Sequence, residues 1–413
     1  MKIIHISTSN QGGGASRAVT RIHKSLKSVK CNSIIWVNDK KGDDYDVISP
    51  KKPIHKLIIL IKIFVSKSLV SLLKTSNSIL HSPQIFSSSW VKLINESNAD
   101  LIHLHWFQHE MLSIADISKI KKPIVWTLHD MWPFCGAEHI SYDNRWKEGY
   151  KKNNRPIDES GFDLNRWVWK RKKKYWKNPV QLIATSRWME ETVSESFLMK
   201  NWPVETIPNP LDLNIWKPMD QFQARDCFNL PKNVPLILFG AIAGTSEFHK
   251  GYDLLESAIK FISSSSKLKD AHLVVFGQSE PQTASKLKIP IIYLGHLNDD
   301  QSLRAAYSSC NLLVVPSRIE SFAQTASEAQ ACGVPVVAFN VTGLKTTVLH
   351  KISGYLAKPF EIKDLANGII WTLNQGNDIL QKKARDSALK RFSYQKIGER
   401  HKILYNKVLK KIT

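Results

Sequence analysis

Residues 311–339 read NLLVVPSRIESFAQTASEAQACGVPVVAF, and this stretch decides the fold. It begins and ends with short, continuous apolar runs, which are typical of strands buried on both faces of a sheet. Between these runs we expect a loop and then a helix from about Phe322 to Cys332. Glu320 falls just before that helix, and Glu328 falls nearly two turns inside it. A strand, a helix and a second strand in succession predict a parallel sheet.

The same alternation of apolar runs and helical segments extends over the whole chain. Continuous runs separated by helices predict an α/β protein in which each half is a Rossmann-like, doubly wound domain. The predicted strands are 2–7, 33–37, 101–106, 123–128 and 181–185 in the first half, and 236–241, 271–277, 291–295, 312–316 and 335–339 in the second.

The boundary between the halves is predicted in the proline-rich segment 204–218, because proline resists continuing a helix or a central strand. We therefore expect an N-terminal domain over 1–205 and a C-terminal domain over 206–390. A last helix, 391–413, is expected to pack back on the N-terminal domain.

The chain is strongly basic, with 58 Lys and Arg against 36 Asp and Glu and a formal charge of +22. Such an excess favours anionic partners: nucleic acid, anionic lipid or phosphorylated substrates. The densest positive segment is 151–177, which mixes ten basic and three acidic residues with aromatic ones. The five cysteines form no CxxC pair, which indicates reduced thiols in a cytoplasm and gives no support to a zinc site.

The most apolar segment is IHKLIILIKIFVSKSLVSLLK at 54–74, and lysines interrupt it. Its uncharged runs fall well short of the roughly 18–20 residues that span a bilayer, so no transmembrane helix is expected. Two alternatives remain: a basic amphipathic helix on a membrane surface, or a helix packed against the sheet. The N-terminus does not have the apolar core of a secretory signal.

Three stretches at predicted strand ends carry residues suited to chemistry. Gly12-Gly13-Gly14 follows strand 2–7 and precedes a helix, so it is either an anion-binding loop or a tight turn. It lacks the GxGxxG spacing of dinucleotide-binding proteins. Lys250-Gly251 precedes a helix, where a lysine is unfavourable unless an anion neutralises it, which makes Lys250 a candidate phosphate ligand or a solvated surface lysine.

His129 and Asp130 follow strand 123–128. Adjacent residues on a strand point to opposite sides, so one side chain is expected in the site while the other holds the loop, and the two should not form a dyad. His103 and His105 share a face of the preceding strand. No third ligand occurs at a sensible spacing, so no metal site is expected.

The loop at Glu320 has a chemical interpretation of its own. If the amides of Ser321, Phe322 and Ala323 hold a phosphate, a second anion beside it would be repelled, so Glu320 should bond hydroxyl groups such as those of a sugar. Glu328 would accept from a second set of hydroxyls, for example those of a ribose.

Together these stretches resemble the GT-B glycosyltransferases of the large retaining family 4. Residues 316–359, PSRIESFAQTASEAQACGVPVVAFNVTGLKTTVLHKISGYLAKP, are similar to that family's donor-binding signature. TLHDMWPFCGAEH and FDLNRWVWKRKKKYW further resemble the branch that builds bacterial exopolysaccharide and O-antigen, including colanic-acid type enzymes. The residues that carry the resemblance are Gly12-Gly13-Gly14, His129, Lys250-Gly251, Phe276-Gly277 and the Glu320-x7-Glu328 pair.

The resemblance implies two Rossmann-like domains facing a central cleft, and a role for each motif. Glu320 would contact the donor sugar, Glu328 the ribose, and His129 the transferred sugar. Lys250 would neutralise the leaving diphosphate without a catalytic metal or other cofactor. The other donor-binding residues implied are Gly13, Gly14, His249, Gly277, Ser321, Phe322 and Ala323.

One departure from the family concerns its second phosphate-binding cation. Many relatives carry an arginine at the place of Ala241-Ile242, and close ones often carry arginine where this chain has His249. The resemblance therefore requires either a protonated His249 or help from another basic residue.

The function expected is hexosyl transfer from a nucleotide-diphosphate sugar to a lipid-linked or oligosaccharide acceptor, with retention, in synthesis of O-antigen, capsule or exopolysaccharide. The enzyme would be cytoplasmic and peripheral on the inner face of the plasma membrane, against polyprenyl-diphosphate acceptors and anionic lipid. The alternatives are another GT-B enzyme such as a sugar-nucleotide epimerase, and a basic nucleic-acid-binding protein. The sequence does not distinguish GDP from UDP donors, and it does not specify the sugar, the linkage or the oligomeric state.

Overall fold

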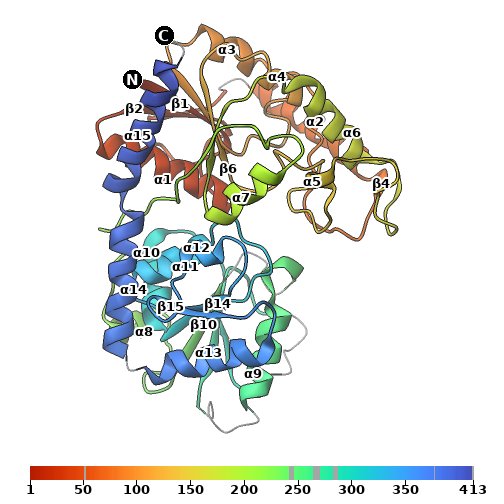
Figure 1. The fold of residues 1–413 in the computed structure, drawn as a ribbon. Helices are drawn as coiled ribbons and strands as arrows, with labels where there is room; N and C mark the ends of the chain where they lie inside the picture. The colour runs from red at the N-terminus through yellow and green to blue at the C-terminus, as the bar shows by residue number, and fades with distance from the viewer. Residues whose placement is uncertain (51–52, 241–245, 264–269, 282–286, 376, 412–413) are drawn as a thin grey trace. The chain divides into compact units, whose positions relative to one another are not determined.

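The computed structural model describes residues 1–413 except 51–52, 241–245, 264–269, 282–286, 376 and 412–413. The chain divides into two compact units (Figure 1). Unit 1 consists of Met1–Ile207 together with Ile397–Thr413, and unit 2 consists of Pro208–Lys396.

Unit 1 is built on a seven-stranded parallel sheet with the order β3-β2-β1-β5-β6-β8-β9. Its strands are β1 (Lys2–Ser9), β2 (Asn32–Asp39), β3 (Val47–Ile48), β5 (Leu101–Leu104), β6 (Ile124–Leu128), β8 (Gln181–Ala184) and β9 (Val204–Thr206). The short strands β4 (Leu73–Lys74) and β7 (Ser160–Gly161) form a separate antiparallel pair. The helices are α1 (Gly14–Ser28), α2 (Pro53–Val70), α3 (Trp90–Glu96), α4 (Ile114–Ile117), α5 (Arg145–Glu148), α6 (Leu164–Tyr175), α7 (Arg187–Glu195) and most of α15 (Tyr394–Lys410).

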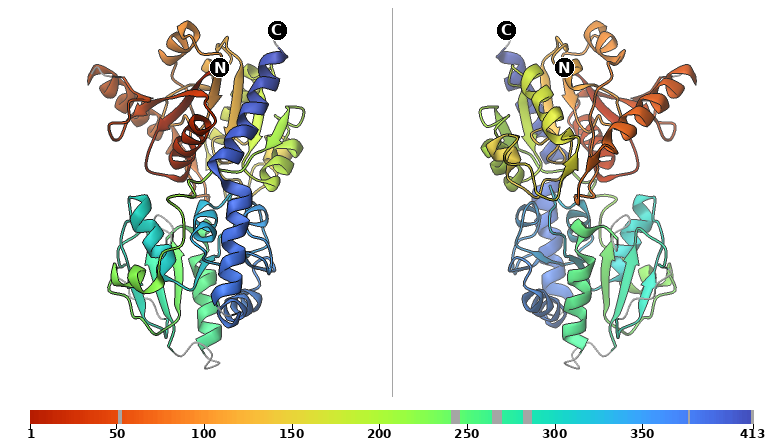
Figure 2. Two further views of the ribbon diagram at one scale, coloured as in Figure 1. Left: turned by 90° about the vertical axis from the view of Figure 1, so that its left-hand side faces the viewer. Right: turned by 90° about the vertical axis from the view of Figure 1, so that its right-hand side faces the viewer.

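Alternate residues of the unit 1 strands point into two different apolar clusters. On one face Ile4 and Ile6 of β1 join a large cluster that includes residues of α3, α4, α6 and α7. On the other face Ile3 packs with residues of α1 and α15. Figure 2 shows α1 and α15 on the same side of this sheet. The sheet is thus covered by helices on both faces, as a doubly wound domain requires.

Unit 2 repeats this architecture with a six-stranded parallel sheet in the order β12-β11-β10-β13-β14-β15. Its strands are β10 (Leu236–Gly240), β11 (His272–Phe276), β12 (Ile291–Tyr293), β13 (Leu312–Val315), β14 (Val336–Phe339) and β15 (Gly354–Ala357). The helices are α8 (Gln221–Asp226), the 3-10 helix η1 (Phe248–Lys250), α9 (Tyr252–Ser263), α10 (Asp300–Ser309), α11 (Gln324–Ala331), α12 (Leu344–Thr347), α13 (Ile362–Asn374) and α14 (Asn377–Phe392). Helices α9 and α13 cover one face, and α10, α11 and α14 cover the other.

The prediction of two parallel-sheet, Rossmann-like α/β domains is confirmed, and each of the ten predicted strands is present within a few residues. Three strands of the two large sheets were not predicted. Strand β9 lies inside the proline-rich segment 204–218, at the edge of the sheet, where Pro203 directly before it costs no ladder bond. Strands β3 and β15 were missed because they are short and their apolar runs are interrupted.

The predicted helix over 54–74 is present as α2, which packs on unit 1 at one end and is exposed at the other. Ser66 is buried, and its Oγ donates to Glu110 Oε1 at 2.7 Å, so the last turns pack on unit 1. Earlier turns leave apolar side chains in solvent, namely Leu57, Ile58, Leu60, Ile61, Phe64 and Val65. Among the described residues, no helix combines the length and apolar character needed to span a bilayer.

Candidate functional site

A glycine allows the segment directly before α9 to lie against the end of β13. Helix η1 is followed by Gly251, whose φ of 70° is in the left-handed region. A Cβ at Gly251 would stand 2.1 Å from the carbonyl oxygen of Pro316, closer than any side chain tolerates. Only glycine allows the two loops this close approach, and the approach brings Lys250 to the segment after β13.

Lys250 and Glu320 form an ion pair at this point. The Nζ of Lys250 donates to Oε1 of Glu320 at 2.7 Å, and the Oγ of Ser317 donates to the same oxygen at 3.0 Å. The side chains of Lys250 and Glu320 are 24% and 17% exposed, so both are accessible to a ligand. Burial by itself would raise the pKa of Glu320, but the charge and hydrogen bond of Lys250, aided by Ser317, outweigh it and lower the pKa below its ordinary value.

The backbone on either side of Glu320 is fixed by the loop before α12. The amide of Glu320 donates to Oγ1 of Thr342 at 3.1 Å, and its carbonyl accepts from the amide of Gly343 at 2.8 Å. A Cβ at Gly343 would collide with the carbonyl of Ser321 at 2.3 Å. The hydroxyl of Thr347 donates to the carbonyl of Phe322. Glu320 is therefore held in place by neighbouring strands of the sheet, through the loops at their carboxyl ends.

The helix expected from about Phe322 begins later than predicted. Ala323 takes the left-handed conformation, with φ of 59°, and precedes α11 as its N-cap residue. A residue in that conformation cannot belong to a right-handed helix, so α11 starts at Gln324. The amides of Ser321, Phe322 and Ala323 consequently belong to the loop ahead of the helix and not to its first turn.

Two basic side chains near Lys250, those of His249 and Arg318, concern the second phosphate-binding cation that many relatives supply as an arginine. Burial and the neighbouring charge of Lys250 lower the pKa of His249, so its ring is neutral at neutral pH in this structure. Arg318, which the sequence analysis passed over, donates to both carboxylate oxygens of Asp253 at 2.8 and 2.6 Å and stacks on the ring of Phe248. Its position two residues before Glu320 is the feature of the sequence that could have singled it out. Ala241 and Ile242 lie outside the described residues.

Gly277 and Glu328 occupy different surroundings in unit 2. Gly277, with φ of 92°, follows β11, and its amide donates to the carbonyl of Gly295 at 2.8 Å. Glu328 is only 3% exposed and accepts a hydrogen bond from the hydroxyl of Tyr307 at 2.7 Å. The predicted contact of Glu328 with a ribose stays a prediction, and its carboxylate is already oriented by Tyr307.

In unit 1 the glycine loop lies at the carboxyl end of β1. Gly12 has φ of 110°, and Gly13 is the N-cap residue of α1 with extended geometry, φ −70° and ψ 176°. Gly12, Gly13 and Gly14 are all exposed. A Cβ at Gly13 would meet no heavy atom within 4 Å, so the chain's own packing does not demand glycine there. The space beside Gly13 is open to solvent, so both the anion-binding loop and the ordinary turn stay possible.

His129 and Asp130 do not pair with each other, as predicted. The Nε2 of His129 lies 3.1 Å from Nδ1 of His105, and the two rings stack with 5.4 Å between centroids. Asp130 instead accepts from Nδ1 of His139 at 2.7 Å and from the amide of Trp132 at 3.0 Å, which holds the loop after β6. Burial lowers the pKa of His129 to about 4, against a smaller opposite effect of Asp130, so the ring is neutral at pH 7.

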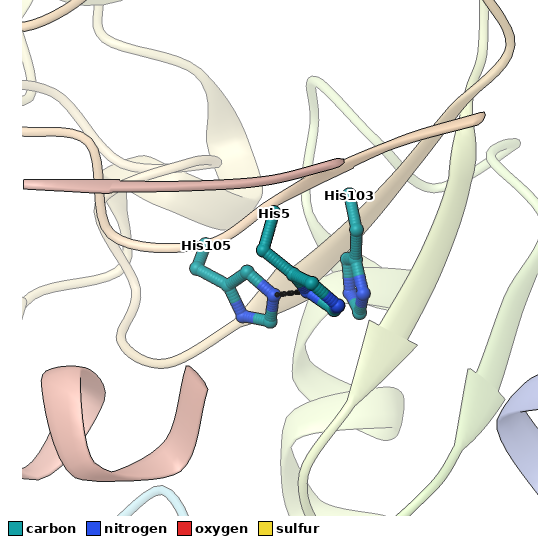
Figure 3. Close-up of side chains that lie close together, drawn as sticks. All are labelled: His5, His103 and His105. Carbon is teal, nitrogen blue, oxygen red and sulfur yellow. Dashed lines mark hydrogen bonds between the residues drawn. The ribbon is translucent and has the colours of Figure 1, made fainter. Parts of the chain in front are cut away.

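The expectation that His103 and His105 have no third partner is wrong. His5 of β1 stands beside them, and one ring nitrogen from each of the three lies within 4.8 Å of the others (Figure 3). Sequence spacing could not reveal this group, because His5 comes from a strand about a hundred residues earlier and reaches the others through the β1–β5 pairing.

Two comparisons with known sequences agree with this architecture. Residues 12–215 match the family Glycosyltransferase Family 4, and residues 221–391 match Glycosyl transferases group 1. A D-inositol 3-phosphate glycosyltransferase of Catenulispora acidiphila is 33% identical over 168 residues, which are 38% of this chain and 40% of that protein. One of Xylanimonas cellulosilytica is 30% identical over 191 residues, 42% of this chain and 44% of that protein. The chain thus spans about two-fifths of the length of these curated relatives.

Solved structures share the fold over nearly the whole chain. Sucrose-phosphate synthase of Thermosynechococcus elongatus superposes with a TM-score of 0.69 at 20% identity, covering 99% of each chain. HepE of Anabaena in complex with UDP-glucose superposes with a TM-score of 0.61 at 19% identity, covering 97% of this chain and 98% of that one. Two Rossmann-like units that superpose on these structures define the GT-B fold. With the two family matches, the chain belongs to the GT-B glycosyltransferases, and so to the transferase class of enzymes.

Proposed function

We propose that the protein is a retaining glycosyltransferase that moves a hexosyl group from a nucleotide-diphosphate sugar to a lipid-linked or oligosaccharide acceptor in bacterial surface polysaccharide synthesis. The observation that carries the proposal is the Lys250–Glu320 pair, partly exposed at the carboxyl edge of the unit 2 sheet. Ligands of open α/β sheets bind at that edge.

The pair suits the two halves of a sugar nucleotide. Lys250 supplies a positive charge for the diphosphate that leaves, and charge stabilisation of this kind is among the largest contributions to catalysis. Glu320, kept ionised by Lys250, accepts hydrogen bonds from hydroxyls of the transferred sugar. The loop amides at 321–323 and the glycine at 277 would face the phosphates and the nucleotide.

The proposed mechanism assigns unit 1 a matching part. Gly13 and Gly14 would approach the diphosphate, and neutral His129 would hydrogen-bond the transferred sugar. The acceptor attacks from the face that the diphosphate leaves, and the departing phosphate takes the acceptor's proton, which retains the anomeric configuration. We propose that side chains and amides neutralise the leaving group without a catalytic metal.

The nature of the donor and acceptor is part of the proposal. HepE, which shares the fold, has crystal structures in complex with UDP and with UDP-glucose, which supports a nucleotide sugar as the donor. The curated relatives are named for D-inositol 3-phosphate, a phosphorylated polyol. Since the chain carries a formal charge of +22, such an anionic acceptor is the second candidate.

We propose that the enzyme works at the inner face of the plasma membrane with α2 against the lipid. The apolar side chains Leu57, Leu60 and Phe64 are 54%, 62% and 71% exposed on one helix. Exposed lysines at 56 and 67 on the same helix, and at 170, 173 and 174 on α6, supply charge complementary to anionic lipid. Large apolar side chains grouped with lysines fit a charged bilayer better than a nucleic acid.

The test is transfer itself, measured with a panel of UDP- and GDP-sugars against polyprenyl-diphosphate-linked sugar, oligosaccharide and inositol phosphate acceptors. We expect product only with an acceptor, retained configuration by NMR, and activity that persists in EDTA. Glu320→Ala should abolish transfer while the thermal midpoint stays near that of the wild type. Epimerisation of a free sugar nucleotide, or a fully active Glu320→Ala variant, would overturn the proposal.

A further inference from the structure

A row of histidines lies on the face of the unit 1 sheet that α1 and α15 cover. His5 comes from β1, His105 follows β5, His129 follows β6 and His23 belongs to α1. His5, His23 and His105 are at most 2% exposed. Figure 3 shows the central part of this row, with the hydrogen bond between His5 and His105.

The ring nitrogens form one continuous chain of hydrogen bonds that ends at His129. His129 Nε2 lies 3.1 Å from His105 Nδ1, and His105 Nε2 lies 2.9 Å from His5 Nδ1. The Oγ of Ser33 then bridges His5 Nε2, at 3.0 Å, and His23 Nδ1, at 2.8 Å. Both nitrogens of His5 and of His105 are thereby engaged within the chain.

All four rings of this chain are neutral at neutral pH. Burial is the main cause in each case: it lowers the pKa of His23 and of His129 to about 4, and lowers those of His5 and His105 well below the ordinary value. A neutral imidazole has one nitrogen that donates and one that accepts. A chain of such rings therefore has only two ordered states, in which every donor points toward His129 or every donor points away from it.

The charge at the far end selects between these two states. The Nε2 of His23 faces Oδ2 of Asp46 at 3.7 Å, and Asp46 is ion-paired with Lys27. A carboxylate accepts hydrogen bonds and repels a lone pair, so His23 is favoured with its proton on Nε2. His23 Nδ1 then accepts from Ser33, and Ser33 accepts from His5 Nε2. In the same direction, His105 Nε2 donates to His5 Nδ1, and His129 Nε2 donates to His105 Nδ1.

We propose that Asp46, His23, Ser33, His5 and His105 act as positioning residues that fix the tautomer of His129, with the proton on Nε2 and Nδ1 left bare. His129 would then meet the transferred sugar as a hydrogen-bond acceptor, so that it selects a sugar hydroxyl and supplies no proton. The tautomer stands on the geometry alone, and its use toward a sugar rests on the proposed function.

A metal ion held by His5, His103 and His105 is the competing interpretation. His103 Nε2 is 2.7 Å from Oγ1 of Thr127, and its Nδ1 is 2.7 Å from the hydroxyl of Tyr405. An ion would take nitrogens away from the buried hydroxyls of Ser33, Thr127 or Tyr405 and leave them unpaired, which is unfavourable. The hydrogen bonds of the chain and of His103 satisfy these hydroxyls without an ion.

The experiment is the two-bond 1H–15N spectrum of the full chain with 15N-labelled histidine, recorded at neutral pH without donor or metal. This spectrum distinguishes protonated from bare ring nitrogens, and His129→Gln assigns the signals. We expect wild-type His129 to be protonated on Nε2. In Asp46→Asn, whose amide no longer selects a direction, the form protonated on Nδ1 should appear.

The kinetic readout follows from the population of the two tautomers. If Asp46→Asn gives an even mixture, kcat/KM should fall roughly twofold, in proportion to the competent fraction. Asp43→Asn removes a charge from an exposed position of the same loop and should change neither spectrum nor rate. Ser33→Ala, which interrupts the chain, should give the same mixture as Asp46→Asn.

Two results would overturn the inference: wild-type His129 protonated on Nδ1, or an Asp46→Asn spectrum identical to that of the wild type. The spectrum requires no substrate, so it tests the inferred tautomer even if the protein turns over no sugar nucleotide. Failure of the proposed function would instead appear as a lack of product from a chain with the expected tautomer.

Discussion

The Nζ of Lys250 lies 2.7 Å from Oε1 of Glu320, although the two residues are 70 positions apart in the chain. The sheet order explains the contact, because β10 and β13 are neighbours and their carboxyl-end loops meet at one edge. The approach depends on Gly251, whose missing side chain admits the carbonyl of Pro316.

Lys250→Ala should slow transfer by about 100-fold or more, the loss typical of removing one group that stabilises a developing charge. Donor turnover measured as released nucleotide diphosphate gives the rate. Lys260→Ala, on the outer part of α9, is the matched control and should retain wild-type activity. A Lys250→Ala enzyme with unchanged kcat would remove this residue from the site.

Gly13→Ala should leave stability nearly intact while weakening donor binding. Its φ of −70° suits alanine and a Cβ would touch nothing in the chain, but alanine is a poorer N-cap residue than glycine, so the thermal midpoint should hold or fall slightly. Only a bound ligand would meet the new methyl group, so KM for the donor should increase about tenfold. Calorimetric titration with the nucleotide diphosphate checks this.

Gly12→Ala provides the contrast to Gly13→Ala. The φ of Gly12, 110°, is unfavourable for alanine, so Gly12→Ala should lower the thermal midpoint. Equal donor affinity in Gly13→Ala and wild type would show that the loop is an ordinary turn.

Lys172→Met should destabilise unit 1 strongly. Lys172 is fully buried, and its Nζ donates to the carbonyls of Trp132, Cys135 and Gly136 in the loop after β6. Methionine keeps much of the volume but leaves those carbonyls unpaired, which should cost about 3 kcal/mol in urea unfolding. Lys170→Met, at an exposed position of the same helix, should change little, and a similar result for both would contradict the structure.

Stability should fall as the pH drops from about 6.5 toward 4. The pKa values of His23, His81, His129 and His401 are lowered to about 4, mainly by burial. In that window the unfolded chain binds protons that the folded chain does not, so each group removes at most about 1.4 kcal/mol per pH unit. Glu138, whose pKa burial raises to about 7, acts in the opposite sense and offsets one of the four. Urea midpoints across this range test the sign, which a flat profile would refute.

The membrane proposal predicts binding to anionic vesicles that salt weakens. Replacing Lys170, Lys173 and Lys174 by alanine should cost about 1 kcal/mol per lysine in partition free energy. Lys172 is excluded from this set because it is buried. Phe64→Gln should also reduce binding, whereas Leu389→Gln, at an exposed apolar position of α14 in unit 2, should not. Vesicle affinity that none of the α2 and α6 variants alters would end the proposal.

Most strands, and the residues that follow them, could be predicted from the sequence alone. Continuous Val, Ile and Leu runs separated by helical segments predicted ten strands of the two sheets, since burial on both faces leaves that pattern in a parallel strand. Residues in the segments after strands, such as Gly13, His129, Lys250 and Glu320, were recognisable as candidates because parallel strands direct their carboxyl ends to the same edge.

Only the tertiary structure decided which of these residues meet. The pairing of β1 with β5 brings His5 beside His105, and helix packing buries Lys172 within a segment that reads as uniformly basic. Helix α11 begins only at Gln324 because Ala323 has a left-handed conformation. An alanine does not favour that conformation by itself, so the surrounding loop must impose it. The pattern of apolar residues that marks a strand or a helix is contained in a short segment of sequence. Strand order, the His129 tautomer and ion pairs instead depend on groups that folding brings together from distant positions.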